Sequence, residues 1–174
     1  MSEPQRQTRH GGTARDVLIS LAVLLIPIAL IVGLTRACTS INVIDPSGTI
    51  GQARSAGHFE VLVPQGLRDG WRAVRASYNE SNGTGTLRVG YLTPDDGAVQ
   101  VLETNEDPQA VLPREFGNDA QPTGTVDING TSWRSYRVRG GQERALAVTT
   151  GPRTTLVQGQ ASDAELRELA ASLR

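Results

Sequence analysis

Residues 17–34 form an uninterrupted apolar run that constrains this chain more than any other stretch. They read VLISLAVLLIPIALIVGL, with no charged side chain and with Ser20 as their one hydroxyl. A helix needs about 17–25 apolar residues to cross a bilayer. The run also lacks the polar stripe that a buried amphipathic helix would show. We therefore expect a membrane-spanning helix over residues 17–34, in which Pro27 is tolerated.

A cleaved signal peptide is the main alternative for this run. Its apolar part normally covers about 7–15 residues and ends at a small-x-small cleavage site. Here the run is longer, and Arg36 stands where a small residue would be needed. These features favour an uncleaved signal anchor.

Cys38 is the only cysteine and follows the run closely. A lipidated cysteine usually has Leu three residues before it and a small residue next, but Thr35 and Arg36 occupy these positions. We expect an unpaired thiol at the membrane boundary, and an intermolecular disulfide stays open. Because no disulfide can form within the chain, the folded part depends on core packing alone.

The charges that flank the run predict its orientation. Arg6, Arg9 and Arg15 precede it, whereas only Arg36 follows closely. The positive-inside rule then places the N-terminus in the cytoplasm and the rest of the chain outside, as a single-pass protein of the cell membrane. The expected organisation is a disordered cytoplasmic tail over residues 1–16, the anchor over 17–34, a linker over 35–46 and an extracytoplasmic domain over 47–174.

The basic residues of the chain are all arginines. There are 17 of them and no lysine, and the net charge is −1. This balance argues against a nucleic-acid partner. The lack of lysine excludes Schiff-base, P-loop-lysine and Ser-Lys chemistry.

Alternating apolar and polar residues predict an antiparallel sheet of about six to seven strands. The expected strands cover residues 59–63, 71–78, 86–93, 98–104, 133–139, 144–150 and 154–160, and residues 126–128 lead into a hairpin turn. Short turns separate them, among them Pro94-Asp95-Asp96-Gly97 and the strong hairpin signal Asn129-Gly130. The turns divide the strands into two meanders.

Three helices are expected outside the membrane. One covers residues 47–57, carries Ile50 and Ala53, and stops at Gly57. A second opens at Asp107-Pro108 and is cut short by Pro113. The third covers residues 162–173 with an apolar stripe, and it begins with a capping box of Ser162 and Glu165. Strands closed by an amphipathic helix indicate an α+β domain, with this helix on one sheet face.

Catalytic and metal-binding patterns are weak in this sequence. His58 is the one histidine of the expected domain, and a partly exposed strand-edge residue explains it better than a triad member. Asp95-Asp96 suits a tight turn, and the alternating Glu103, Asn105 and Asp107 lack the glycine of a calcium loop. We assign no catalytic, cofactor-binding or metal-binding residue, and we expect no cofactor.

Four arginines of the expected strands are the one surface feature that suggests a binding role. They lie opposite the apolar residues of their strands and are Arg75, Arg88, Arg137 and Arg139. If these strands are neighbours, the arginines form an interaction face for anionic lipid or an acidic partner. An ordinary solvated sheet face, in a chain whose only base is arginine, is the competing explanation.

Short motifs spread along the chain carry a resemblance to a known family. They are Arg15-Asp16, Asp45-Pro46, the FEVLVP segment at 59–64, Leu67 with Gly70-Trp71-Arg72, Gly90-Tyr91, Thr93-Pro94, and Asn129-Gly130 with Trp133. In this order, over nearly the whole chain, they resemble the actinobacterial membrane-anchored proteins of domain-of-unknown-function family 4245 (DUF4245). The resemblance implies a single-span protein with an exported domain, and it brings no activity and no catalytic residues.

The sequence favours a non-catalytic envelope protein. In this hypothesis residues 17–34 hold the domain at the bilayer, where it binds an envelope protein, a lipid or a wall component. Two alternatives stay open. One is a wall-acting hydrolase or transferase with dispersed carboxylates. The other is a small accessory subunit whose span packs against a larger membrane protein.

Overall fold

The computed structural model of this chain describes residues 19, 21, 23–27 and 42–174. Asn42–Arg174 form one compact unit, in which the described part of the fold lies. The expected tail, most of the expected span, Cys38 and residues 35–41 of the linker lie outside the described residues. The residues of the span that are described are helical. Within the described ranges, no helix is both long and apolar enough to cross a membrane.

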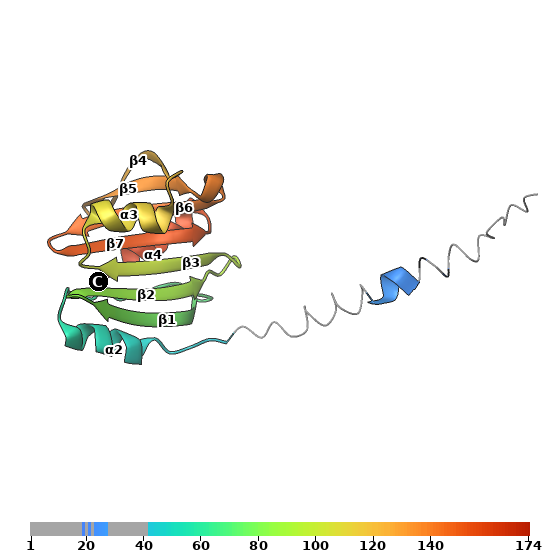
Figure 1. Ribbon diagram of the computed structural model, residues 1–174, viewed down its shortest axis with the longest axis horizontal. Helices are drawn as coiled ribbons and strands as arrows, with labels where there is room; N and C mark the ends of the chain where they lie inside the picture. Colours follow the sequence, from blue (N-terminus) through green and yellow to red (C-terminus); the bar gives the residue numbers. More distant parts are fainter. Residues whose placement is uncertain (1–18, 20, 22, 28–41) are drawn as a thin grey trace, which may run out of the picture. The chain divides into compact units, whose positions relative to one another are not determined.

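Seven antiparallel strands form a single sheet in the order β1-β2-β3-β7-β6-β5-β4 (Figure 1). The strands are β1 (Arg72–Ser81), β2 (Thr84–Leu92), β3 (Ala98–Thr104), β4 (Gln121–Ile128), β5 (Thr131–Val138), β6 (Glu143–Thr150) and β7 (Arg153–Gln160). Consecutive strands pair within each of the two meanders, β1–β3 and β4–β7. The expected α+β class and the two meanders are confirmed. The pairing of β3 with β7 joins the meanders into one sheet.

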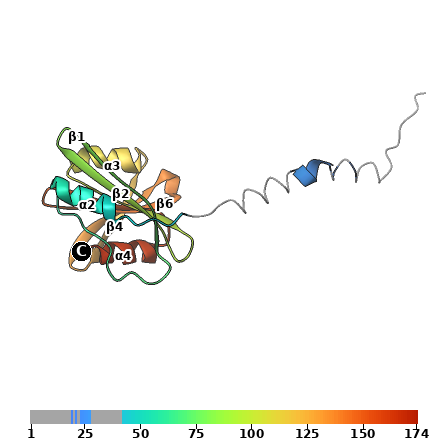
Figure 2. The same ribbon diagram turned by 90° about the horizontal axis from the view of Figure 1, so that it is seen from below.

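Helices cover both faces of this sheet, but unequally. The helices are α2 (Ser47–Ala56), α3 (Pro108–Phe116) and α4 (Asp163–Ser172), with a short 3-10 turn η1 (Arg139–Gly141) between β5 and β6. Figure 2 shows α3 and α4 on opposite sides of the sheet. Residues of α2 and α4 pack into one hydrophobic cluster, and residues of α3 pack into another. We refer to the two sides as the α2/α4 face and the α3 face.

The helix ends agree with the sequence analysis where capping residues specify them. Gly57 ends α2 in the left-handed conformation, with φ 68°. At the start of α4, the hydroxyl of Ser162 accepts from the amide of Glu165, and the carboxylate of Glu165 accepts from the amide of Ser162. The expected capping box is therefore present.

Residues 59–63 do not form the strand that their alternation predicts. Phe59 and Val61 are buried, so the period-2 pattern reflects burial correctly. Beyond them, however, only an isolated bridge joins Pro64 to Leu173. The segment crosses the α2/α4 face as part of a connection over residues 57–71, which we call the strap. Periodicity reports which side chains are buried and does not report whether a neighbouring strand is present.

Pro113 does not cut α3 short, in contrast to the expectation. The helix passes through it and continues to Phe116. Asp107 caps its start and accepts from the amide of Gln109 at 2.8 Å. A proline at this position removes one helical hydrogen bond, to the carbonyl of Gln109 on the exposed first turn. Burial of Val111 and Phe116 against the sheet outweighs that loss, since packing supplies most of a short helix's stability.

The surroundings of Gly159 in β7 show how closely the two meanders approach each other. A Cβ atom at this position would collide with the backbone of Ala98 and Val99 in β3. Gly51 in α2, by contrast, has open space around the position of a Cβ atom.

We expect Gly159→Ala to lower the free energy of unfolding by several kcal/mol, because the β3–β7 contact must shift. Gly51→Ala is the matched control and should raise stability by about 0.5–1 kcal/mol, since alanine is the better helix former. Urea unfolding followed by tryptophan fluorescence measures both changes. A Gly159→Ala protein as stable as the wild type would contradict this account of the β3–β7 contact.

Candidate functional site

The α3 face is covered by a single short helix, and a hollow remains on the β5–β6 side of α3. Its volume is about 430 Å³. Residues from α3 form one wall, and the strands form the floor. The lining residues include Asp107, Pro108, Gln109 and Leu112 beside or in α3, Ser132, Arg134 and Tyr136 in β5, Ala147 and Thr149 in β6, and Thr154 in β7. We call this hollow the α3 groove.

Local periodicity brings these side chains together. Ser132, Arg134 and Tyr136 alternate along β5, so all three point to the α3 face while Trp133 is buried on the other side. Pro108 and Leu112 are four residues apart and therefore share one side of α3. The fold thus builds the groove from a strand face and a helix face that are far apart in sequence.

The lining of the α3 groove combines hydrogen-bonding groups with apolar surface. The hydroxyls of Thr149 and Thr154 lie 3.3 Å apart. The ring of Tyr136 packs on Phe116 with centroids 5.1 Å apart. Arg134 is exposed, and its side chain forms no ion pair with another residue of the described part of the chain. The groove can therefore offer a free guanidinium, several hydroxyls and an aromatic ring to a small molecule.

A second hollow of about 390 Å³ lies on the β1–β2 side of the same face. Its charges are already paired with each other. Arg88 contacts Glu115 at 2.7 Å, and Arg114 contacts Glu115 at 3.2 Å and Glu106 at 2.5 Å. Because these arginines are neutralised within the protein, this hollow is a weaker candidate than the α3 groove for a charged or hydroxylated ligand.

The four arginines that the sequence singled out do not share one surface. Arg75 and Arg88 lie on the neighbouring strands β1 and β2 and share one face, because Arg75 pairs with Gly90 and Arg88 with Ser77. Arg88 contacts Glu115 of α3, so this is the α3 face. Arg137 is on β5, three strands further along the sheet from β3.

The other two of these arginines lie on different parts of the fold. Arg137 pairs with Arg144 of β6, whose side chain contacts Asp163 at the start of α4, so Arg137 faces the α2/α4 side. Arg139 lies in η1 and contacts Glu143 at 2.9 Å. An interaction role for any of the four stays a prediction.

The acidic and amide residues considered as metal ligands in the sequence analysis have separate structural roles. Asp95 contacts Arg68 at 3.1 Å. Asn105 accepts from the amide of Gly85, and Asp107 caps α3. Glu103 is buried on the α2/α4 face. Among residues 42–174, no group of three or more His, Cys, Asp or Glu side chains could hold a metal ion.

His58 lies beside the hairpin of β1 and β2. Its Nε2 atom is 3.0 Å from Oε1 of Glu80 in β1. The ring also occupies the space where a Cβ atom at Gly85 would be, so it packs against β2. This position ties the start of the strap to the sheet.

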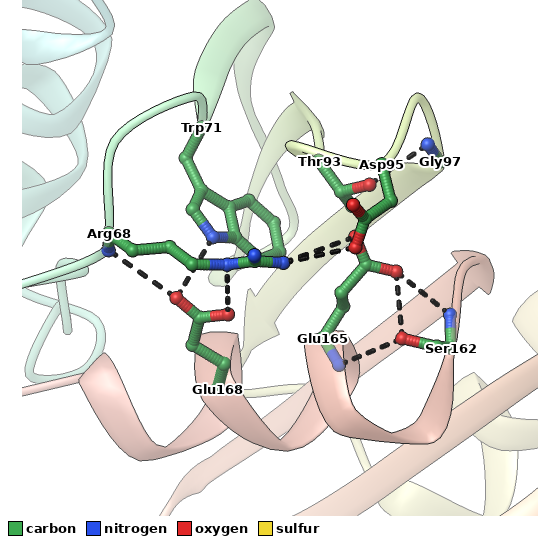
Figure 3. Close-up of polar contacts among 8 residues, drawn as sticks. All are labelled: Arg68, Trp71, Thr93, Asp95, Gly97, Ser162, Glu165 and Glu168. Carbon is green, nitrogen blue, oxygen red and sulfur yellow. Dashed lines mark hydrogen bonds and ion pairs between the residues drawn. The ribbon is translucent and has the colours of Figure 1, made fainter.

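Arg68 is the centre of a polar cluster that holds the strap to α4 (Figure 3). Its guanidinium contacts Glu168 at 3.1 Å and Asp95 at 3.1 Å. The indole of Trp71 donates to Glu168 at 3.2 Å. Glu165 lies 3.8 Å from the same guanidinium. The cluster joins the strap, the β2–β3 turn and α4, so its role is structural.

Glu165 is nearly inaccessible to solvent, yet its environment favours the ionised carboxylate. Burial by itself would raise its pKa, but the polar groups of Thr93, Ser162 and Asp95 outweigh burial and lower the pKa to about 2. Since an unfolded glutamate titrates near 4.5, its contribution to stability is present above that pH. It is lost as the pH falls through about 2.

Glu165→Gln tests this assignment without removing the capping box, because glutamine also suits the third helical position. We expect the free energy of unfolding of the wild type to fall more steeply than that of the variant between pH 4.5 and 2. Urea unfolding at a series of pH values measures the difference. Parallel curves for the two proteins would contradict the low pKa of Glu165.

Sequence reasoning did not single out the α3 groove. The alternation of β5 placed Arg134 and Tyr136 on one strand face, but it did not indicate where α3 lies over the sheet.

Comparison with known proteins tests the family membership that the sequence motifs suggested. A search of curated proteins found no match. The model of the family described as protein of unknown function (DUF4245) matches residues 9–173, nearly the full chain. The chain therefore belongs to the DUF4245 family.

Proposed function

We propose that this protein is a membrane-anchored, extracytoplasmic and non-catalytic binding module of the cell envelope. The observation that carries the proposal is the α3 groove, an open hollow of about 430 Å³ whose lining is both polar and apolar. Small-molecule sites in proteins commonly have such volumes and a few convergent polar groups. The apolar run at residues 17–34 and the arginines before it support the anchor and its orientation.

A saccharide of the cell wall is the ligand class that fits the groove best. Arg134 and Asp107 are its charged residues and have opposite signs, so the groove does not select strongly for charge. Hydroxyls of Ser132, Thr149 and Thr154 can donate and accept hydrogen bonds. The apolar side chain of Leu112 can contact the C–H face of a sugar ring. Sugars likewise combine hydroxyl groups with an apolar C–H surface.

The enzymatic alternative finds less support in the groove. A glycosidase of the usual kind needs two carboxyl groups on either side of the scissile bond. Asp107 is the one carboxylate among the residues that line the α3 groove, and it is engaged as the cap of α3. Binding without bond cleavage is therefore the function that this lining supports.

The position of Cys38 allows a direct test of the topology. As the only cysteine, it should react with a membrane-impermeant maleimide in intact cells after removal of the wall. In a Cys38→Ser background, Ser55→Cys on the exposed side of α2 should react in the same way. Ser2→Cys in the tail should react only after the membrane is made permeable. Labelling of Ser2→Cys alone in intact cells would reverse the proposed orientation.

The saccharide site is tested by NMR titration of the full-length protein in nanodiscs with N-acetylglucosamine oligomers. We expect chemical-shift changes at Arg134, Tyr136 and Thr149. Arg134→Ala should weaken binding about tenfold or more, because a hydrogen bond from a charged donor contributes about 1.5–3 kcal/mol. Arg75→Ala is the matched control, since Arg75 is also exposed on this sheet face but does not line the groove.

Two results would contradict the proposed site. One is a set of shift changes that lies outside the α3 groove. The other is a loss of binding in Arg75→Ala with none in Arg134→Ala, which would favour the surface of Arg75 and Arg88 instead.

A further inference from the structure

Glu103 is a buried acidic residue that belongs neither to the α3 groove nor to the Arg68 cluster. It lies in the interior strand β3, and its exposed fraction is 1%. Its Oε1 atom accepts from the backbone amide of Leu62 in the strap at 3.2 Å. Its Oε2 atom has no hydrogen-bond partner among the described residues. An acidic group in this state needs an explanation, because unpaired buried polar atoms are rare and costly.

Two other buried polar atoms without partners lie next to Glu103 on β7. Thr155 is directly opposite Glu103 in the β3–β7 pairing, and its hydroxyl has no partner within the described chain. Arg153 is two residues earlier on the same face, and its Nε atom is 3.9 Å from Oε1 of Glu103. That Nε atom is also without a hydrogen-bond partner in residues 42–174. Glu103 and Arg153 are thus close to each other, but no direct hydrogen bond joins them.

A small cavity of about 10 Å³ lies against Glu103. Its other walls are mostly apolar and include Ile50, Leu62, Pro64 and Leu87. This volume corresponds to about one water molecule. The strap closes the cavity on one side through Leu62 and Pro64.

Hydrogen bonds attach the strap around this cavity, among them one from the amide of Gln65 to the carbonyl of Ser172 at 2.9 Å, and the side chains of Phe59 and Val61 are buried beneath it. Besides the Leu62–Glu103 hydrogen bond, Nη1 of Arg153 donates to the carbonyl of Glu60 at 2.7 Å. Backbone bonds join Val63 to Arg174 in both directions, at 3.0 and 3.2 Å. Two of these attachments therefore involve the Glu103–Arg153 pair itself.

We propose that Glu103 is a buried, pH-dependent latch for the strap: the neutral carboxyl group keeps residues 59–63 seated on β3, and its ionisation favours their release. A neutral carboxyl group can remain in an apolar cavity at low cost. A carboxylate there leaves Oε2 as a charged atom without a donor, and water can reach it only if the strap moves. The proton is given up to the water that enters.

The charges around Glu103 support this assignment. Burial raises its pKa to about 7, against the lowering effects of the Leu62 amide, of Arg153 from β7 and of Arg54 from α2. Glu60 in the strap acts in the same direction as burial. Tyr91 on β2 also lines the cavity, and burial raises its pKa to about 12, so it stays neutral.

The direction of the pH effect follows from these values. In the open form Glu103 is exposed to water and titrates near its ordinary pKa of 4.5. The closed form binds the proton more tightly, so closure is most favourable below pH 4.5. It weakens as the pH rises toward about 7 and then levels off. The equilibrium constant for closure of the strap should fall by about two orders of magnitude between pH 4.5 and about 7.

Native-state hydrogen exchange of the full-length protein in nanodiscs tests the latch. NMR would follow the amides of Leu62 and Gln65, after correction for the intrinsic pH dependence of exchange. We expect their protection factors to fall by about 100-fold between pH 4.5 and 7 in the wild type. In Glu103→Gln, which keeps the side-chain volume and an acceptor for the Leu62 amide, they should not depend on pH.

The amide of Leu146 in β6 provides the internal reference, because a buried residue of an interior strand is expected to exchange only with the unfolding of the whole domain. Leu62 should exchange faster than Leu146 at every pH. Equal exchange at both sites would mean that the strap opens only on global unfolding, and it would overturn the proposal. Persistence of the pH dependence in Glu103→Gln would also overturn it. In Arg153→Gln the loss of protection at Leu62 should occur at higher pH, since the variant lacks the nearest cation that favours ionised Glu103.

Discussion

The pairing of β3 with β7 is the interaction on which the rest of this domain depends. Each meander alone would be a small sheet with a free edge at the strand that is most buried in the complete domain. The pairing runs from Ala98 opposite Gln160 to Thr104 opposite Thr154. It makes these two strands central, and Leu102, Leu156 and Val157 become fully buried. The close approach at Gly159 is the cost of this arrangement, since the position accepts no larger residue without a shift of β3.

Because side chains alternate along a strand, β7 contributes to both faces of the domain. Thr154 lines the α3 groove, whereas Arg153 and Thr155 point toward Glu103 on the α2/α4 face. The proposed binding site and the proposed latch therefore use opposite faces of β7. They remain chemically distinct, because one is open to water and the other is closed by the strap.

The two faces differ in how completely they are covered. On the α2/α4 face two helices and the strap cover most of the core, and several polar atoms buried beneath them have no partner among the described residues. On the α3 face a single nine-residue helix covers the centre and leaves open hollows on its β5–β6 and β1–β2 sides. Unequal cover thus gives the domain one face suited to ligand binding and one suited to stability. The proposed membrane anchor would hold such a site near other envelope components.

The sequence by itself determined the features that depend on neighbouring residues. Alternation predicted the strands, Asn129-Gly130 predicted a hairpin, and Ser162 with Glu165 predicted the start of α4. It misjudged residues 59–63 and Pro113, where burial against distant parts of the fold decided the outcome. The arginines of β1 and β5 could not be assigned to one surface, since strand order is a long-range property. Only the tertiary structure placed α3 over the sheet and Glu103 beneath the strap. Packing between segments that are distant in the sequence created both sites, and local periodicity carries no information about such contacts.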